Sequence, residues 1–449
     1  MIKTKESLQS YLDAFEQFEK RATAPQWLQQ IRREAFARFW ELGFPTLKDE
    51  DWRFTNLGPI TSADFDLARA TSVNPDTLAR VIPSWAEIRL VFVNGVFAPE
   101  LSVPGEGQRG VVVMSLAEAI AASHPIVKEH LAKHEDFRGD AFTSLNTAFI
   151  QDGTFVLVER GTVLERPVYV LYVSTGDTAQ MAHPRNLFVA EEQSQATFVE
   201  DYVSLPSARG PAAADGNART AFFSNVVTEL VAGADSVLSH FMVEREDEAA
   251  LNVSTLSIHQ ERNANVDSHS VLVGGALVRN NVHPVLAGEG ADCLINGLFM
   301  ANGRQHMDNY MKVEHASPHC NSRQFYNGIL DGQSRGVFHG RIIVHKDAQK
   351  TDAKQTNRNL LLSNDAQIDT KPQLEIYADD VKCTHGATIG QMDEEALFYM
   401  RSRGIPDADA RRLMLFAFAS ECLDRVKPGV VREWLETMVP EWLPQRAKR

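Results

Sequence analysis

The sequence predicts a mainly β fold, a parallel β-helix flanked by α-helical regions, and three observations lead to this prediction. From about Thr154 to Ile389 strand-like segments follow one another with almost no convincing helix. A fragment made of a turn residue and a small or polar pair recurs there at an irregular period, at Glu192, Gly233, Asn263, Gly290, Gly332 and Asp365. Doublets that we expect to form corners stand at Asn296-Gly297, Asn327-Gly328, His339-Gly340 and His385-Gly386. The pattern favours stacked coils that bury their inner faces on their neighbours, although a β-sandwich or jelly roll predicts a similar texture.

Residues 1–150 are predicted to form a helical or mixed N-terminal region. Apolar residues at helical spacing indicate one helix over 8–18 and a second over 28–42, which Gly43 and Pro45 end. The polar segment 48–55, anchored by Trp52, is expected to pack across these helices. The remaining elements expected here are a hairpin with an Asn94-Gly95 turn, a strand at 111–114, a short helix at 116–122 and a broken helical stretch at 125–149.

Residues 151–390 are predicted to be the β-helix core, and residues 391–449 a helical C-terminal region. The small, polar insertion at 205–217 is expected to be a loop, because it cannot join a core. Helices are expected at 394–400 and at 430–438. Between them, Asp407 is expected to cap a helix whose apolar stripe is Leu413, Phe416, Ala417, Ser420 and Leu423. These helices either cap an open end of the strand region or present a docking face to a partner.

Composition and charge narrow the class of protein. The 449 residues carry a net charge of −14, which argues against a nucleic-acid partner, since phosphate binding needs clustered Lys and Arg. Met1 leads straight into a polar helix and no apolar run reaches a membrane span, so we expect neither a signal peptide nor a membrane partner. The four cysteines form no Cys-x-x-Cys motif, and the cytoplasm is the expected compartment.

The sequence matches two catalytic or binding motifs, but the predicted elements around each match do not fit the motif. Ser334 lies in a Gly-x-Ser-x-Gly sequence, but a strand-like segment follows it where a hydrolase elbow needs a helix. The glycines at 105, 107 and 110 match a dinucleotide fingerprint, but Val111 opens a strand there rather than a helix. There is no Walker A sequence, so the chain does not hydrolyse nucleotide through a P-loop.

The most informative feature is Cys383-Thr-His385. On a strand these two side chains share one face, which places a soft sulfur donor beside a nitrogen donor. Such a pair suits iron, copper or zinc, although a buried Cys can simply pack and a lone His is often structural. Asp308, His315 and Cys320 are a second candidate set, for which hydrogen-bonded corners are the favoured explanation.

Three runs of sequence resemble the SufB/SufD family of iron–sulfur cluster assembly scaffold proteins. They are residues 348–363, the run from Asp379 through Cys383 and His385 to Gln391, and the run from Glu395 to Ile405. The resemblance is strongest over roughly residues 290–425. The Cys383–His385 run and the region around Trp52 resemble the SufD side of the family rather than the SufB side.

The resemblance implies a right-handed parallel β-helix between helical ends. It implies pairing with SufB through the β-helix and docking of the SufC ATPase on the C-terminal helices, with ATP used only through SufC. It also implies a transient iron–sulfur cluster shared with SufB, toward which His385 is similar to a ligand and Cys383 assists. No cofactor is expected in the isolated chain, which is expected to form a homodimer when alone.

We therefore expect a non-catalytic scaffold subunit. Two alternatives remain from the residues themselves. One is a β-helix carbohydrate-active enzyme, against which stands the lack of a convincing pair of catalytic carboxylates. The other is a purely structural homodimer.

Overall fold

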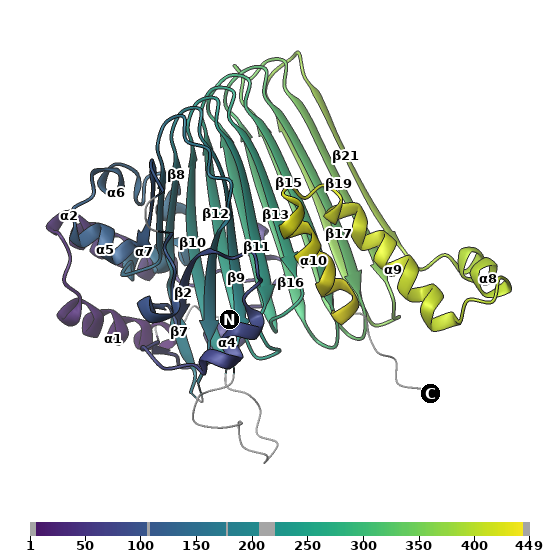
Figure 1. Ribbon diagram of the computed structural model, residues 1–449, viewed down its shortest axis with the longest axis horizontal. Helices are drawn as coiled ribbons and strands as arrows, with labels where there is room; N and C mark the ends of the chain where they lie inside the picture. The colour runs from purple at the N-terminus through teal and green to yellow at the C-terminus, as the bar shows by residue number, and fades with distance from the viewer. Residues whose placement is uncertain (1–5, 106–107, 177, 206–220, 443–449) are drawn as a thin grey trace.

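A computed structural model describes residues 6–105, 108–176, 178–205 and 221–442. Their main body is a parallel β-solenoid in which each turn adds one strand to each of two sheets (Figure 1). The strands of the successive turns pair in parallel register without a slip, for example Asn321 with Asp352 and Asp352 with Lys382. This confirms the predicted β-helix with helices at both ends, and it rules out a sandwich of antiparallel strands. The predicted loop at 205–217 lies outside the described residues except for Leu205.

The two sheets face each other across the interior core of the solenoid. Sheet A contains β4 (Val111–Ser115), β5 (Thr154–Val158), β8 (Arg185–Ala190), β10 (Phe222–Ala232), β12 (Leu251–Gln260), β14 (Leu277–Leu286), β16 (His306–His315), β18 (Arg335–Val344) and β20 (Gln367–Ile376), with β1 (Asp66–Leu67) and β7 (Gln180–Ala182) beside them. Sheet B contains β3 (Val96–Phe97), β2 (Ile88–Val93), β6 (Val168–Ser174), β9 (Gln195–Ser204), β11 (Val237–Arg245), β13 (Asn265–Leu272), β15 (Asp292–Ala301), β17 (Asn321–Leu330), β19 (Asp352–Leu361) and β21 (Lys382–Gly390).

The recurring turn-and-pair fragments do form the corners, but the four doublets do not. Each doublet lies within a strand. At three of them the glycine makes room inside the solenoid: a Cβ on Gly297 would stand 2.0 Å from the Tyr326 ring, and one on Gly340 would stand 1.8 Å from Nε2 of Gln355. A glycine in a strand can mark such a close approach as well as a turn, and the sequence pattern alone did not separate the two.

Most of the N-terminal helices cover the outer face of sheet A, whereas α4 (Pro75–Val81) and η2 (Pro99–Leu101) pack with residues of sheet B. Aromatic residues of the covering helices form one cluster with Phe223 and Leu251 of sheet A, and Phe15 stacks on Phe36 at 4.1 Å. The other elements of this region are α1 (Glu6–Arg21), α2 (Gln26–Leu42), η1 (Glu50–Trp52), α3 (Gly58–Thr61), α5 (Leu116–Ala121), α6 (Pro125–His130), η3 (Phe137–Gly139) and α7 (Ala141–Ala148).

The segment 48–55 does more than pack across the N-terminal helices. Trp52 contacts Phe142 of α7, as expected, but it also lies over the Arg279 guanidinium of β14. Glu50 reaches Nζ of Lys371 on β20 at 2.7 Å. The segment therefore spans the outer face of sheet A as far as the last strand, a contact that no local pattern reveals.

The first turn of the solenoid is partly covered. β3 and β4 pair in antiparallel fashion with their neighbours at the two sheet edges. Phe97, Val111 and Val113 from these strands pack against the interior core. These half-buried side chains therefore cover part of the interior at this end.

The C-terminal helices do not cap the other end. These are α8 (Glu394–Ser402), α9 (Asp407–Leu423) and α10 (Gly429–Trp442). The latter two lie across the outer face of sheet B, whereas α8 stands away from the solenoid (Figure 1). Asn296 and Asn327 donate side-chain hydrogen bonds of 2.9 Å to the carbonyls of Cys422 and Phe418 in α9.

Two details of α9 differ from the expectation. Pro406, not Asp407, occupies the N-cap position, and Asp407 begins the helix. Leu413 is exposed, while the buried face is formed by Ala410, Leu415, Ala419, Cys422 and Leu423. The expected apolar stripe shares only Leu423 with this buried face, because α9 has apolar residues on several sides. Among the described residues no helix has the length and apolar character needed to cross a bilayer.

Candidate functional site at the open end of the solenoid

The last turn of the solenoid has no neighbour on its outer side. β20 pairs only with β18, and β21 only with β19, within the described chain. Alternate residues of β19 are buried, whereas nearly all of β21 is exposed. Three large apolar side chains here face solvent: Ile376 is 40% exposed, Tyr377 63% and Ile389 55%. A surface of this kind, with free strand edges and apolar side chains, is suited to covering by another chain.

Cys383 and His385 both lie on β21, on the face that continues the interior of the solenoid. Cys383 stands in register with Ala353 and His385 with Gln355, both buried residues of β19. Cys383 is half-buried against the interior core, and His385 is exposed. The structure thus places the two predicted site residues side by side on the exposed turn.

The two side chains differ in readiness to bind a metal. Burial raises the pKa of the Cys383 thiol, and the nearby Asp352 carboxylate adds to the effect against the backbone N–H of Ala353. The thiol is therefore protonated at neutral pH, while only a thiolate is a good ligand. His385, by contrast, is exposed on the same strand.

Polar side chains continue below His385 into the interior. Gln355 donates from Nε2 to Oε1 of Gln324 at 2.8 Å, one turn further in. Asn357 and Asn359, on the same face of β19, bond to each other at 2.6 Å. The site thus rests on a layer of amide side chains.

Ion pairs brace the outer face of the last turns of sheet A. Arg335 reaches Asp369 at 2.7 Å and Arg341 reaches Glu375 at 2.7 Å, both between β18 and β20. The Glu375 carboxylate raises the pKa of Arg341, which keeps its charge. Such pairs hold β20 in register although its outer edge is free.

The second candidate set does not converge. Asp308 faces outward and pairs with Arg279, while Thr55 donates a hydrogen bond to it. His315 bonds to the Ser322 hydroxyl at 2.8 Å, and the Cys320 thiol donates to the Gly288 carbonyl at 3.3 Å. These are structural partners, as the favoured explanation expected. Ser334 likewise donates to the Ala301 carbonyl at 3.1 Å, and β18 follows it.

In the described ranges no group of three or more His, Cys, Asp or Glu side chains is arranged to hold a metal ion. The pair on β21 is therefore at most part of a ligand set. A complete set needs donors from another molecule.

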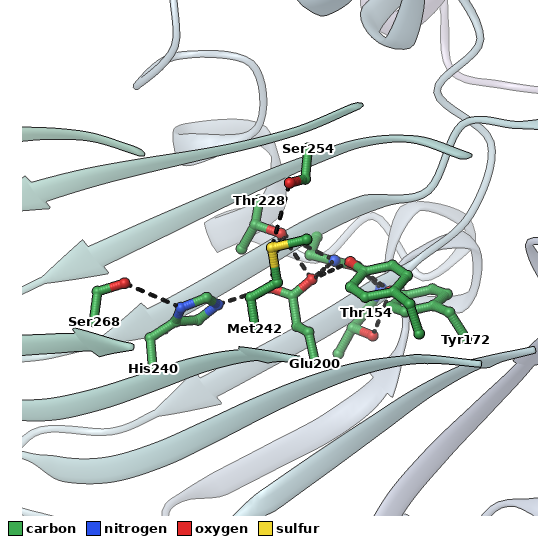
Figure 2. A network of polar contacts seen from close by, with 10 residues as sticks. Thr154, Tyr172, Glu200, Thr228, His240, Met242, Ser254 and Ser268 are labelled. Carbon is green, nitrogen blue, oxygen red and sulfur yellow. Dashed lines mark hydrogen bonds and ion pairs between the residues drawn. The ribbon is translucent and has the colours of Figure 1, made fainter. Parts of the chain in front are cut away.

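A polar network in the middle of the solenoid was missed from the sequence. Glu200 accepts hydrogen bonds from Asn186, Tyr202, Thr228 and His240 at 2.7 to 2.9 Å, all inside the solenoid (Figure 2). Burial and this carboxylate raise the pKa of Tyr202 well above its usual range. The available signal was the charged residue Glu200 between the inward-pointing Phe198 and Tyr202. This signal can be used only when it is known which face of the strand points into the solenoid.

Comparison with known proteins agrees with this architecture. Residues 172–418 match the family described as "SUF system FeS cluster assembly, SufBD core domain", and residues 5–170 match "SufBD protein N-terminal region". An iron–sulfur cluster assembly protein SufD of Escherichia coli is 32% identical over 431 residues, 95% of this chain and 93% of that protein. A SufBD family protein of Synechocystis is 33% identical over 387 residues, 86% and 84% of the two chains. SufD of Bacillus subtilis is 25% identical over 442 residues, 96% and 97%. The chain therefore belongs to the SufBD family of iron–sulfur cluster assembly proteins.

Proposed function

We propose that this protein is a non-catalytic scaffold subunit that pairs through the open end of its solenoid with SufB and contributes His385 to a nascent cluster at the junction. Cys383 assists, and the cluster is the cargo of the complex rather than a resident cofactor. The cytoplasm is the proposed compartment, in keeping with four cysteines that are all free.

One observation carries the proposal: the turn that holds His385 is also the turn that lacks a neighbour. A β-solenoid of the same construction can continue both sheets across this end by pairing with β20 and β21. His385 would then lie at the seam between two subunits. Donors from the second subunit and bound sulfide would complete the ligand set, which two residues of one chain cannot.

The thiol of Cys383 fits an assisting role. Its raised pKa keeps it protonated while the turn is uncovered. A cation bound at the seam favours the thiolate and lowers that pKa again.

We propose that the SufC ATPase docks on the C-terminal helices, and that ATP acts only through it. Phe398 and Tyr399 of α8 are 72% and 60% exposed, and Leu413 of α9 is 53% exposed. A pocket between these helices and the solenoid corners is lined by Leu361, Met392, Arg411 and Leu415 among others. Motion of a partner on this face is transmitted to sheet B through the bonds of Asn296 and Asn327 to α9.

The test is anaerobic reconstitution of the full complex with SufB and SufC, with wild-type protein or His385→Ala. We expect cluster formation, followed by the rise of its visible absorption, to slow by about tenfold or more, since even outer contacts of metal sites cost this much. His345→Ala is the matched control, because His345 is an exposed histidine on the corner after β18 that pairs with Glu314 and does not lie on β21.

Subunit association is measured in the same preparations. If His385→Ala leaves the complex intact and cluster formation at the wild-type rate, the ligand role is wrong. In the absence of SufB we propose that the same open end pairs with a second copy, so the isolated chain should sediment as a dimer.

A further inference from the structure

Two glutamines form a pair directly beneath His385. Gln324 of β17 and Gln355 of β19 stand in the same register position, and both are 2% exposed. Nε2 of Gln355 donates to Oε1 of Gln324 at 2.8 Å. The pair exists because sheet A carries Gly340 opposite: a Cβ there would stand 1.8 Å from Nε2 and 2.6 Å from Cδ of Gln355.

The hydrogen bonds of this glutamine pair are incomplete. Oε1 of Gln355 is buried and has no hydrogen-bond partner within the described part of the chain, and the same holds for Nε2 of Gln324 on the inner side of the pair. A buried acceptor left in this way costs about 1–3 kcal/mol, so it calls for a specific explanation. On the outer side of Gln355, the next turn can supply a donor.

The next residue in that register is His385. β21 pairs in parallel with β19 so that His385 is opposite Gln355, and the two side chains share the inward face. Neighbouring strands lie about 4.8 Å apart, which brings an amide oxygen and an imidazole nitrogen in register within hydrogen-bond reach. His385 has no hydrogen bond of its own among the described residues, so its ring is free to turn.

We propose that Gln355 is the positioning residue of His385: its Oε1 accepts a hydrogen bond from one imidazole N–H and directs the other nitrogen out of the open end. A neutral imidazole binds a metal through the nitrogen that carries no proton, and the partner of its N–H decides which nitrogen that is. Gln324 fixes Gln355 in turn. The value of this contact for a cluster ligand rests on the proposed function, but the hydrogen bond itself does not.

The test reads the tautomer of His385 in the isolated, metal-free, full-length protein. The chain is labelled with ¹⁵N-histidine, and the two ring nitrogens of His385 are assigned by their loss in His385→Ala. At a pH where the imidazole is neutral, we expect the wild-type shifts of a single tautomer. In Gln355→Met, of similar size but without an acceptor, both shifts should move toward the average of the two tautomers.

Gln355→Glu separates accepting from donating. A carboxylate can only accept, and Gln324 can turn its amide to donate to it, so this variant should keep the single tautomer. Asn357→Ala is the matched control: it removes another buried amide of β19, two residues along, and should leave the His385 shifts unchanged.

Three results overturn the proposal: mixed tautomers in the wild type, a single tautomer that persists in Gln355→Met, or its loss in Gln355→Glu. Should Gln355→Met fail to fold, the tautomers of His385 in the wild type and in Gln355→Glu still test the proposal. A single tautomer with normal cluster assembly by His385→Ala would uphold this contact and overturn only the ligand role.

Discussion

At the scale of single residues, the most demanding contact is a buried ion pair that joins the N-terminal region to the solenoid. Arg185 and Glu229 are fully buried and 2.6 Å apart. Glu229 also accepts the backbone N–H groups of Ala132, Lys133 and His134 at 2.8 to 3.0 Å. The Glu229 carboxylate of β10 thus holds the turn that follows α6 against the solenoid.

Replacing Arg185 by Ala should lower the free energy of unfolding by about 3–5 kcal/mol, because it leaves a buried carboxylate without its cation. Urea denaturation measures the change. Arg262→Ala breaks the exposed pair with Asp235 and should cost about 0.2–1 kcal/mol. Equal losses in the two variants would contradict the assigned role of Arg185.

At the scale of elements, the strands are shaped by glycines that give space to neighbouring side chains. Gly340→Ala should destabilise the protein by about 1–3 kcal/mol, as overpacking does, since the new Cβ meets the amide of Gln355. Gly139→Ala is the control, because a Cβ there meets nothing within 4 Å. Midpoints of denaturation compare the two, and a stable Gly340→Ala would mean that the glutamine pair is free to shift.

These glycines also mark the limit of prediction from the sequence. Strand alternation sufficed to place Cys383 and His385 on one face, and the recurring turn fragments sufficed to find corners, but the Asn-Gly and His-Gly doublets were wrongly predicted to be corners. Asn296-Gly297 and Asn327-Gly328 read as corners because an Asn-Gly pair favours turns. Their actual role, with Asn bonding α9 and Gly admitting a neighbour's side chain, depends on residues some 30 to 126 positions away.

The candidate site was predictable to the same degree. The local pattern gave the two ligand candidates, but not that β21 is the uncovered strand. The partnership of His385 with Gln355 requires the register between β19 and β21, which is set by the whole stack of turns. Long-range register is what a single sequence does not reveal.

At the scale of the whole molecule, buried histidines tie stability to pH. Burial lowers the pKa of His183 and His269 to about 3, and that of His306 and His315 to about 4. Each folded pKa lies below the ordinary value of about 6.5, so the folded state disfavours the proton. Stability is then complete above that ordinary value and falls as the pH drops below it.

We expect the free energy of unfolding, measured in urea, to decrease from about pH 6.5 toward pH 4. His183→Phe keeps an aromatic ring against Phe149. This variant should make the decrease shallower, because unfolding then takes up to one proton fewer. The exposed His319→Asn should leave the slope as it is. A slope unchanged in His183→Phe would show that this ring is protonated in the folded protein.

The two ends of the solenoid are unlike, and this limits what the molecule can build. At the first end, Phe97, Val111 and Val113 pack against the interior core, and β3 and β4 run antiparallel to their neighbours, so this end differs from a continuing parallel turn. A molecule that pairs through the β20–β21 end alone forms a dimer and does not grow further. The difference between the two ends therefore favours a closed pair over a filament, which needs matching contacts at both ends.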